Sequence, residues 1–323
     1  MGEPVFVTYP IPSPGVEMLS ENFEVRVHPA EPQADRDAIV SGAAGCRGLL
    51  TLVRDRVDSN LFDQLPDLRV VANYGVGYDN IDIAEATRRG IVVTNTPDVL
   101  TASTADLALA LILAATRRVG EGERLVRSGR TWAWNPKMLL GLELDGATLG
   151  IVGMGRIGMA VARRAQGFGM GVVYAESIPR PDADALGLRR VELAELLGTS
   201  DIVTIHVALT DETRHLIDEA ALRRMKPTAY LINTSRGPVI DEKALARALK
   251  EGWIAGAGLD VYEHEPQVEV ALLELENVVL LPHLGSATTW TRSEMARVAA
   301  TNLVAALSGT RPPNIVNPEV LDH

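Results

Sequence analysis

Polar side chains of two kinds follow apolar, strand-like runs in the second half of the sequence. Arg236 comes shortly after the run at 229–233, and His283 comes shortly after the run at 278–281. An arginine fork matches the two oxygens of a carboxylate, and a histidine exchanges protons near neutral pH. With an acidic partner that stabilises the imidazolium, this set predicts proton exchange with a hydroxyl or carbonyl oxygen of a small acid.

The acidic partner of the histidine has rival positions. The segment 258–266, Gly-Leu-Asp-Val-Tyr-Glu-His-Glu-Pro, lies between the two runs and offers Glu263 and Glu265 with His264 between them. Functional side chains of α/β folds gather at the carboxyl ends of parallel strands, so these segments are expected to meet. A buried core histidine is the alternative for His283, and the association with Arg236 and an acid makes that alternative the weaker one.

A glycine pattern precedes these residues. Gly153 and Gly155 stand between a strand-like run at 148–152 and a helix-like stretch at 157–168, and Gly158 lies in the first turn of that stretch. In this setting the first glycine permits a tight turn, the second lets the backbone approach a pyrophosphate, and the third permits close packing of helix on strand. Free N–H groups at the helix N-terminus then bind phosphate. The pattern predicts a dinucleotide site.

The type of dinucleotide depends on the next strand-like run, which ends at Glu176. An acid at this distance from the glycines accepts hydrogen bonds from the ribose hydroxyls and repels a 2′-phosphate, which favours NAD. Arg180 follows closely and could reach a 2′-phosphate, so NADP stays possible. Together with Arg236 and His283, the cofactor pattern predicts hydride transfer between a nicotinamide and a hydroxy or oxo acid.

The elements that must position these residues alternate along the chain, which is typical of βα units and parallel sheets. Strands are expected at 5–8, 24–27, 48–52, 69–72 and 91–94 in a first series, and at 148–152, 171–175, 201–207, 229–233, 254–259 and 278–281 in a second. A long apolar helix is expected at 101–118 and a last helix at 291–307. No Ser/Gly-rich linker separates the series, so two packed α/β domains with a ligand cleft between them are expected.

Composition narrows the class of protein. The net charge of −11 argues against a nucleic-acid partner, which would need a basic surface. The most apolar helix-like stretch, at 107–115, is far shorter than the roughly 20 residues of a membrane span. Cys46 is the only cysteine, so no intrachain disulfide is possible, and the first residues do not resemble a secretory signal. A cytoplasmic location without a membrane segment or metal site is expected.

Taken together, these segments resemble the D-isomer-specific 2-hydroxyacid dehydrogenase family, and the resemblance covers essentially the whole chain. The motifs stand in the family's order: Asn-Thr-Ser-Arg-Gly at 233–237, Gly-Leu-Asp-Val-Tyr-Glu at 258–263 with Glu265-Pro266, and Pro-His-Leu-Gly-Ser-Ala at 282–287. The resemblance implies two doubly wound parallel-sheet domains. These are a flavodoxin-like substrate domain at 1–99 and 287–323, and a Rossmann-type NAD-binding domain at 100–286.

The resemblance also implies catalytic roles. Arg236 would bind and polarise the substrate, His283 would be the general acid/base, and Glu265, the acid directly before Pro266, would be its partner. Asp260 would hold the nicotinamide carboxamide. The implied cofactor contacts are Thr104, Gly153, Gly155, Arg156, Ile157, Gly158, Glu176, His206, Val207, Thr213, Thr234, Ser235, Arg236, Asp260, His283 and Gly285.

Substrate binding is expected to involve the first half of the chain as well. The resemblance implies that backbone N–H groups of Val76 and Gly77 hold the substrate carboxylate, with Arg236 and His283 at the reacting oxygen. Leu52 and the two residues after it follow a strand that faces the expected cleft, so they are expected to help define substrate size.

Within the family, the segments 95–101, 104–106, 126–129 and 285–288 resemble glyoxylate and hydroxypyruvate reductases most. This likeness implies NAD(P)H-dependent reduction of glyoxylate or hydroxypyruvate to the D-2-hydroxy acid. Trp134 matches a tryptophan that in such enzymes can enter the neighbouring subunit's active site, and an anchor in a dimer interface is an equal alternative. Trp134 and the apolar helix at 101–118 predict a homodimer.

Other functions stay open at this point. Another 2-hydroxyacid dehydrogenase is one alternative. Phosphite dehydrogenases are a second, although they typically carry lysine where this chain has Val76. A binding protein that senses NAD, like the transcriptional co-repressors built on the same fold, is a third, and no basic or low-complexity interaction tail supports it.

Overall fold

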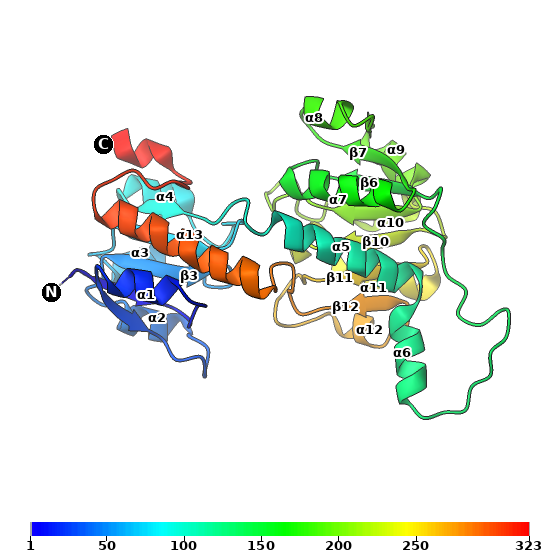
Figure 1. The fold of residues 1–323 in the computed structure, drawn as a ribbon, viewed down its shortest axis with the longest axis horizontal. Helices are drawn as coiled ribbons and strands as arrows, with labels where there is room; N and C mark the ends of the chain where they lie inside the picture. Colours follow the sequence, from blue (N-terminus) through cyan, green and yellow to red (C-terminus); the bar gives the residue numbers. More distant parts are fainter. Residues whose placement is uncertain (1, 323) are drawn as a thin grey trace. The chain divides into compact units, whose positions relative to one another are not determined.

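The chain folds into two compact units in a computed structural model that describes residues 2–322. The first unit consists of the chain up to Leu100 together with the chain from Ala287 onward, and the second unit is Thr101–Ser286. Figure 1 shows a sheet covered by helices in each of them. The first unit is therefore built from two separate stretches of sequence.

The first unit contains a five-stranded parallel sheet in the order β2-β1-β3-β4-β5. This order is typical of flavodoxin-like folds. The strands are β1 (Pro4–Val7), β2 (Glu24–Val27), β3 (Gly48–Leu52), β4 (Val70–Tyr74) and β5 (Val92–Thr94). The helices are α1 (Gly15–Ser20), α2 (Arg36–Gly42), α3 (Ser59–Gln64), α4 (Ile83–Arg88), α13 (Thr289–Leu307) and the 3-10 helix η2 (Pro318–Asp322).

Both faces of β1, β3 and β4 are buried, because apolar residues fill consecutive positions of these strands, whereas the edge strand β2 is largely exposed. Val5 and Val7 pack with Leu303 and the rest of the core beneath α1 and α13. Phe6, which points the other way, packs with Leu61 and the core beneath α2, α3 and α4. Helices therefore cover both faces, and the carboxyl ends of the strands are left to carry functional residues.

The second unit contains a seven-stranded parallel sheet in the order β12-β11-β10-β9-β6-β7-β8, which corresponds to the Rossmann order with an added edge strand. The strands are β6 (Thr148–Val152), β7 (Gly171–Ala175), β8 (Arg189–Arg190), β9 (Ile202–Ile205), β10 (Tyr230–Asn233), β11 (Gly256–Leu259) and β12 (Val278–Leu280). The helices are α5 (Thr101–Thr116), α6 (Val119–Arg127), α7 (Arg156–Gly167), α8 (Pro181–Asp184), α9 (Leu193–Thr199), α10 (Glu219–Arg224), the 3-10 helix η1 (Gly237–Val239), α11 (Glu242–Glu251) and α12 (Val270–Leu273).

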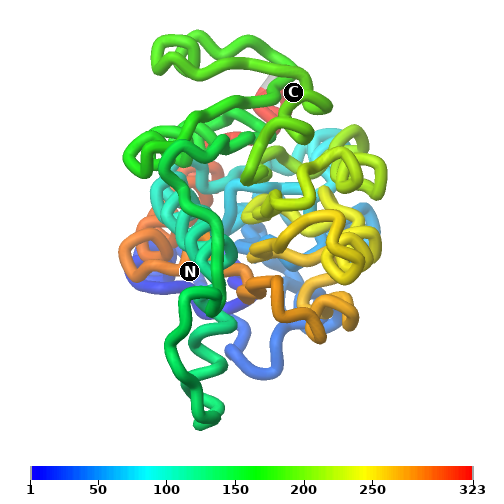
Figure 2. The backbone as a smooth tube through the Cα atoms, turned by 90° about the vertical axis from the view of Figure 1, so that its right-hand side faces the viewer, coloured from blue at the N-terminus to red at the C-terminus, as the bar shows by residue number. Residues whose placement is uncertain are grey.

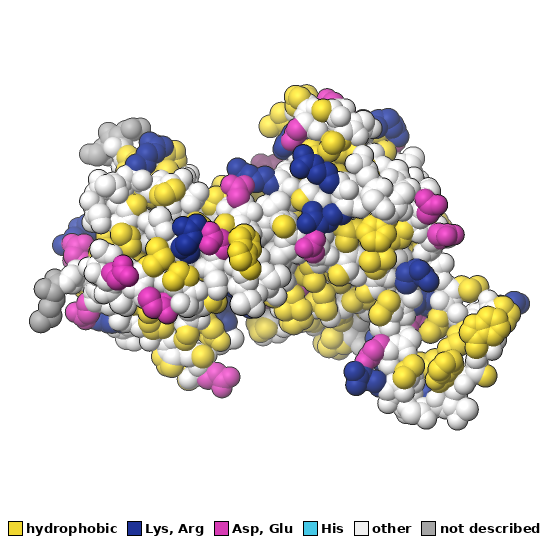
Figure 3. Space-filling model, viewed as in Figure 1, with side chains coloured by type: hydrophobic (Ala, Val, Ile, Leu, Met, Phe, Trp, Pro, Cys, Tyr) yellow, Lys and Arg dark blue, Asp and Glu magenta, His cyan; other side chains and the backbone are white. Residues whose placement is uncertain are grey.

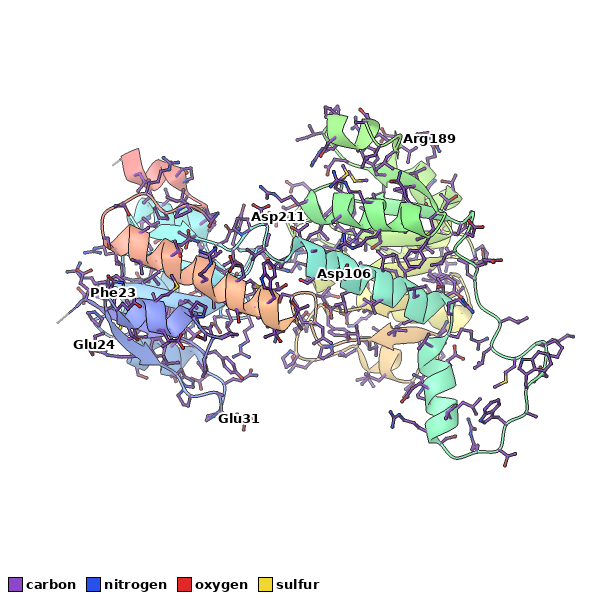
Figure 4. All side chains as sticks on the ribbon, in the orientation of Figure 1. Phe23, Glu24, Glu31, Asp106, Arg189 and Asp211 are labelled. Atoms are coloured by element: carbon purple, nitrogen blue, oxygen red, sulfur yellow. The ribbon has the colours of Figure 1, made fainter. Side chains whose placement is uncertain are left out.

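Helices again cover both faces of this sheet. Residues of α5 and α7 form one core with Leu149 and Ile151, and residues of α9, α10 and α11 form another with Val203 and Leu231. On the surface, Arg164 of α7 donates to Asp106 of α5 with Nε and Oδ1 2.6 Å apart; Asp106 is labelled in Figure 4. The expected α/β class with doubly wound parallel sheets is confirmed.

Several expectations about the elements of the second unit are wrong in detail. The strands expected at 201–207 and 254–259 span only Ile202–Ile205 and Gly256–Leu259. The helix expected at 101–118 ends at Thr116, because Arg118 adopts a left-handed φ of 52° and turns the chain into α6. Strand β8 was not expected, since it is only two exposed arginines that pair with β7 at the sheet edge. Arg189 is labelled at that edge in Figure 4.

The segment that follows α6 extends away from the rest of the second unit in both ribbon and tube views (Figures 1 and 2). Residues 128–137 are exposed throughout. Apolar side chains gather on this projecting segment (Figure 3), among them Trp132, Trp134 and Leu140, and Trp134 is 79% exposed. Among the helices of residues 2–322, none has the length and apolar character to span a membrane.

Candidate active site

The glycine loop lies between β6 and α7, where the sequence predicts it. Gly153 has a φ of 94°, a conformation that residues with a Cβ rarely adopt. A Cβ on Gly158 would lie 2.2 Å from the carbonyl oxygen of Gly153, whereas a Cβ on Gly155 would meet nothing within 4 Å. The first and third glycines are thus required by the turn and the packing, and open space lies at the second, beside the N-terminus of α7. This cradle fits a pyrophosphate.

Substitution of Gly158 by alanine should therefore disturb the loop itself. The new methyl group can be accommodated only if the turn at Gly153 moves, because the atom it meets belongs to the backbone. We expect the dissociation constant for NADH, measured by fluorescence titration, to rise about tenfold or more, as for loss of one good contact. Gly167→Ala is the matched control, since it adds a methyl group to the same helix with nothing within 4 Å. Equal NADH affinities of the two variants would contradict this account of the loop.

Glu176 follows β7 and lies against the glycine loop. Its Oε2 accepts a hydrogen bond from the backbone N–H of Met154 at 3.0 Å, and its Oε1 accepts one from the N–H of Ser177 at 2.9 Å. Arg180, which the sequence offers as a possible contact for a 2′-phosphate, forms two hydrogen bonds with Asp182. Arg190 is the arginine that contacts Glu176, since its Nε donates to the Glu176 carbonyl at 2.8 Å.

The ends of β9 and β10 carry the other residues expected near the cofactor. Burial lowers the pKa of His206 to about 3, so its ring is neutral at physiological pH, and its Nε2 lies 2.9 Å from the hydroxyl of Thr204. The hydroxyl of Thr234 is buried and finds no hydrogen-bond partner within residues 2–322. A buried hydroxyl of this kind fits contact with a polar ligand group. Ser235, in contrast, is held by its own strand, because its N–H and hydroxyl both donate to Asn233 Oδ1.

Three further expected residues belong to the structure around these strand ends. Thr104 of α5 is buried and donates to the carbonyl of Gly285 at 3.2 Å, so it joins the helix to the turn after β12. The hydroxyl of Thr213 donates to the carbonyl of Ala208 at 2.7 Å and thereby closes its own loop. Val207 packs at the edge of the core beneath α9, α10 and α11.

His283 follows β12 and adopts a left-handed φ of 56°. Such a backbone is unfavourable for a residue with a side chain and is often retained at functional sites. Its Nδ1 lies 2.9 Å from Oε2 of Glu265, and 35% of each side chain is exposed. The structure therefore selects Glu265 over its rival Glu263, whose Oε1 lies 2.7 Å from Nε2 of His215.

Glu265 is held as a carboxylate by its surroundings. Burial alone would raise its pKa, but the hydrogen bond and charge of His283, the N–H of Tyr262 and the charge of Arg236 together hold the pKa of Glu265 below its ordinary value. Arg236 follows β10, and its Nη1 donates to the carbonyl of Ser235 at 2.9 Å. Cation, acid and histidine thus share one electrostatic environment in the second unit.

Asp260 holds the backbone of the turn after β12, a role that its sequence motif does not predict. It is fully buried, and its two carboxylate oxygens accept the backbone N–H groups of Leu284 at 2.6 Å and Gly285 at 2.8 Å. Burial raises its pKa, and those two hydrogen bonds and the charge of His283 oppose the rise. Asp260 therefore fixes the turn that presents His283.

The loop after β4 in the first unit offers two backbone donors. Asn73 donates to the carbonyl of Gly77 at 2.7 Å, Asn95 donates to the carbonyl of Val76 at 2.8 Å, and the N–H of Thr96 donates to the carbonyl of Gly75 at 3.0 Å. All three carbonyls of the loop are thus engaged.

The N–H groups of Val76 and Gly77 have no hydrogen-bond acceptor in the described part of the chain. A carboxylate fits two such donors. Leu52 ends β3 beside this loop, since β3 pairs with β4 in the register Leu52–Tyr74. Sequence reasoning missed Asn73 and Asn95, because single asparagines at strand ends carry no distinctive spacing.

Comparison with known proteins identifies the family of this chain. The family model described as the D-isomer specific 2-hydroxyacid dehydrogenase, NAD binding domain, matches residues 109–285. A glyoxylate reductase of Korarchaeum cryptofilum is 55% identical over 98% of this chain and 96% of its own length.

Solved structures are similar over the same length. The TT0316 protein of Thermus thermophilus has a TM-score of 0.91 and 46% identity, covering 97% of this chain and 99% of its own. An NADPH-dependent glyoxylate/hydroxypyruvate reductase of Sinorhizobium meliloti, in complex with NADP and malonate, has a TM-score of 0.87 and 37% identity, covering 99% of this chain and 98% of its own. The chain therefore belongs to the D-isomer-specific 2-hydroxyacid dehydrogenase family and is an oxidoreductase that uses NAD(P).

Proposed function

We propose that this chain reduces glyoxylate, and hydroxypyruvate as a second substrate, with NADH as the preferred reductant. The observation that carries the proposal is the 2.9 Å contact between His283 and Glu265 at the end of β12, with the charge of Arg236 acting on the same carboxylate. The glyoxylate reductase from Korarchaeum cryptofilum supports the choice of substrate. Glu176 at the glycine loop supports the choice of NADH, and NADPH is the alternative cofactor.

The proposed chemistry divides between the bound cofactor and the residues of this chain. The nicotinamide, when bound, supplies the hydride. His283 donates a proton to the carbonyl oxygen of the substrate, and Glu265 stabilises the imidazolium that this donation requires. Arg236 offers its guanidinium to the developing negative charge on the same oxygen.

Binding of the acid group is assigned to the first unit. We assign the substrate carboxylate to the N–H groups of Val76 and Gly77, whose loop carbonyls are already occupied by Asn73, Asn95 and Thr96. Leu52, at the end of the neighbouring strand, is assigned to the size limit of the substrate. In this proposal the first unit is the substrate domain and the second unit is the cofactor domain.

A panel of spectrophotometric assays tests the proposed substrate. NADH and NADPH are each combined with glyoxylate, hydroxypyruvate and pyruvate, and NAD is then combined with phosphite and with D-glycerate. We expect the highest kcat/KM with NADH and glyoxylate. Faster oxidation of phosphite or of D-glycerate would show that glyoxylate is not the preferred substrate. No turnover in any assay would favour a protein that binds NAD without catalysis.

The pH dependence should reveal the pairing of Glu265 with His283. Because the pKa of Glu265 is held below its ordinary value, the carboxylate is ionised across the neutral range and favours protonated His283. Glu265→Gln removes that anion, so the pH above which reduction falls off should move lower, by about one unit for a loss of ~1.4 kcal/mol. The measurement is a kcat profile with glyoxylate from acid to alkaline pH. An unchanged profile would count against the pairing.

We also infer that the chain forms a homodimer and is located in the cytoplasm. The projecting segment after α6 carries Trp132, Trp134 and Leu140, which are all exposed in the single chain. Large apolar side chains gathered on one segment favour a protein interface. Light scattering of the purified protein should give twice the mass of the chain, and a monomer at micromolar concentration would refute the dimer.

A further inference from the structure

We propose that Glu242 is a positioning residue for the reaction, because it holds both ends of the loop that presents Glu265 to His283. This inference rests on the proposed function, in which Glu265 stabilises protonated His283. Glu242 is the first residue of α11 and lies in no motif that carries the chemistry above. Its hydrogen bonds to the loop that contains Glu265 connect it to the pair of Glu265 and His283.

The carboxylate of Glu242 is used for the loop and not for its own helix. Asp241 already caps α11, since its Oδ1 accepts the N–H of Ala244 at 2.9 Å. Glu242 is only 5% exposed, and its Oε1 accepts the backbone N–H of Glu263 in a short hydrogen bond. Its Oε2 accepts the backbone N–H of Glu269 at 3.3 Å. One carboxylate therefore joins the two ends of a loop that contains Glu265.

The start of this loop also packs against the residue that follows Arg236. A Cβ on Gly237, the residue after Arg236, would lie 1.8 Å from the carbonyl carbon of Tyr262, so the two segments touch through their backbones. The hydroxyl of Tyr262 donates to the carbonyl of Leu281 near the end of β12, and its N–H donates to Oε1 of Glu265 at 3.1 Å. Glu265 is thereby placed by the same loop that Glu242 closes.

The burial of the Glu242 carboxylate has a desolvation cost. Burial raises the pKa of Glu242, and its two backbone hydrogen bonds and the charge of His264 only oppose this rise, while the charge of Glu263 adds to it. A buried carboxylate whose hydrogen-bond partners are backbone N–H groups is costly to desolvate. Other titratable side chains at this loop are His215, paired with Glu263, and His283, paired with Glu265. The charge of Arg236 also acts on Glu265, and that of Asp260 acts on Tyr262.

Glu242→Gln tests this role with little change of shape. The amide keeps one acceptor and places an NH₂ group against a backbone N–H, so one end of the loop is released. We expect kcat for glyoxylate to fall about tenfold, as for a small displacement of a catalytic group. We also expect the pH above which reduction falls off to move lower, in the direction of Glu265→Gln.

Two controls separate positioning from general stability. Asp218→Ala removes another backbone-capping carboxylate of the second unit, since Asp218 Oδ1 accepts the N–H of Ala221 at 2.8 Å. Glu274→Gln makes the same charge change as Glu242→Gln at an exposed position. Asp218→Ala should lower Tm, Glu274→Gln should leave Tm unchanged, and neither should shift the pH profile. An equal shift of the pH profile in Asp218→Ala would show that Glu242 acts only through stability, and it would overturn the proposal.

A double substitution decides whether Glu242 acts through Glu265. In a Glu265→Gln background, Glu242→Gln should give no further shift of the pH profile, because coupled residues do not add. Independent, additive shifts would overturn the proposal. If Glu265→Gln itself leaves the profile unchanged, the pairing of Glu265 with His283 in the proposed function fails; if only Glu242→Gln leaves it unchanged, this inference alone fails.

Glu269→Pro provides a second route if Glu242→Gln does not fold. It deletes the N–H that Glu242 accepts, at a φ of −53° that proline readily adopts. We expect a shift of the pH profile in the same direction, and an unshifted profile in a folded Glu269→Pro protein would contradict the proposal.

Discussion

His283→Ala is expected to lower kcat for glyoxylate reduction by about two orders of magnitude or more, the size of effect that a general acid contributes. The structure gives two reasons to assign this role to His283 and not to His206. His283 contacts Glu265 at 2.9 Å with part of its ring exposed, whereas burial lowers the pKa of His206 to about 3, so its ring is neutral and lacks the acidic proton of an imidazolium.

The measurement is steady-state NADH oxidation at saturating glyoxylate, with the NADH dissociation constant determined in parallel. His28→Ala is the control, because His28 is a partly exposed histidine of the first unit whose Nδ1 lies 2.7 Å from the carbonyl oxygen of Pro29. Its kcat should match that of the unaltered protein. A His283→Ala enzyme with nearly full turnover would remove His283 from the mechanism.

Arg236→Lys is expected to lower kcat/KM for glyoxylate by about 100-fold or more, the cost of losing a donor aimed at developing charge. Lysine keeps the positive charge but cannot reproduce the planar fork of the guanidinium. The backbone around Arg236 is fixed, because Asn233 donates to its carbonyl at 2.9 Å and Gly237 packs on Tyr262. The backbone therefore cannot move to bring the lysine ammonium group into the position of the guanidinium.

Arg223→Lys provides the matched control for this change. Arg223 lies over the ring of Trp253 at 3.6 Å and pairs with Glu219 on the surface of α10, away from the strand ends. We expect this variant to keep its kcat/KM. Equal activity of Arg236→Lys and Arg223→Lys would show that the charge and not the fork of Arg236 is required, or that neither is.

The sequence alone predicts the fold well because its signals are local and repeated. Val5, Phe6 and Val7 are all apolar, which is typical of a strand buried on both faces, and they pack into two different cores. The glycine loop between β6 and α7 was predicted for the same reason, since strand, turn and helix follow one another in sequence. Strand β8 could not be predicted, because Arg189 and Arg190 have no strand-like pattern.

The candidate site could be predicted only where a motif carries it. Arg236, Glu265 and His283 were selected by their motifs, and the preference for Glu265 over Glu263 needed the family pattern. The contact of Glu263 with His215 shows why charge alone could not decide, since both acids lie beside a histidine.

The hydrogen bonds that support the site could not be predicted from the sequence. Asp260 holds the turn of Leu284 and Gly285, and Asn95 holds the carbonyl of Val76 nineteen positions away along the chain. Contacts of this kind depend on tertiary placement and leave no local pattern. Glu242 belongs to the same class.

The most direct test of the proposed function is the rate at which the purified, unaltered protein oxidises NADH in the presence of glyoxylate at neutral pH. We expect glyoxylate-dependent loss of absorbance at 340 nm, characteristic of NADH, with a stoichiometric yield of glycolate. An enzyme that binds NADH but leaves the absorbance unchanged with glyoxylate and hydroxypyruvate alike would contradict the assignment of His283, Glu265 and Arg236 to reduction of a small 2-oxo acid.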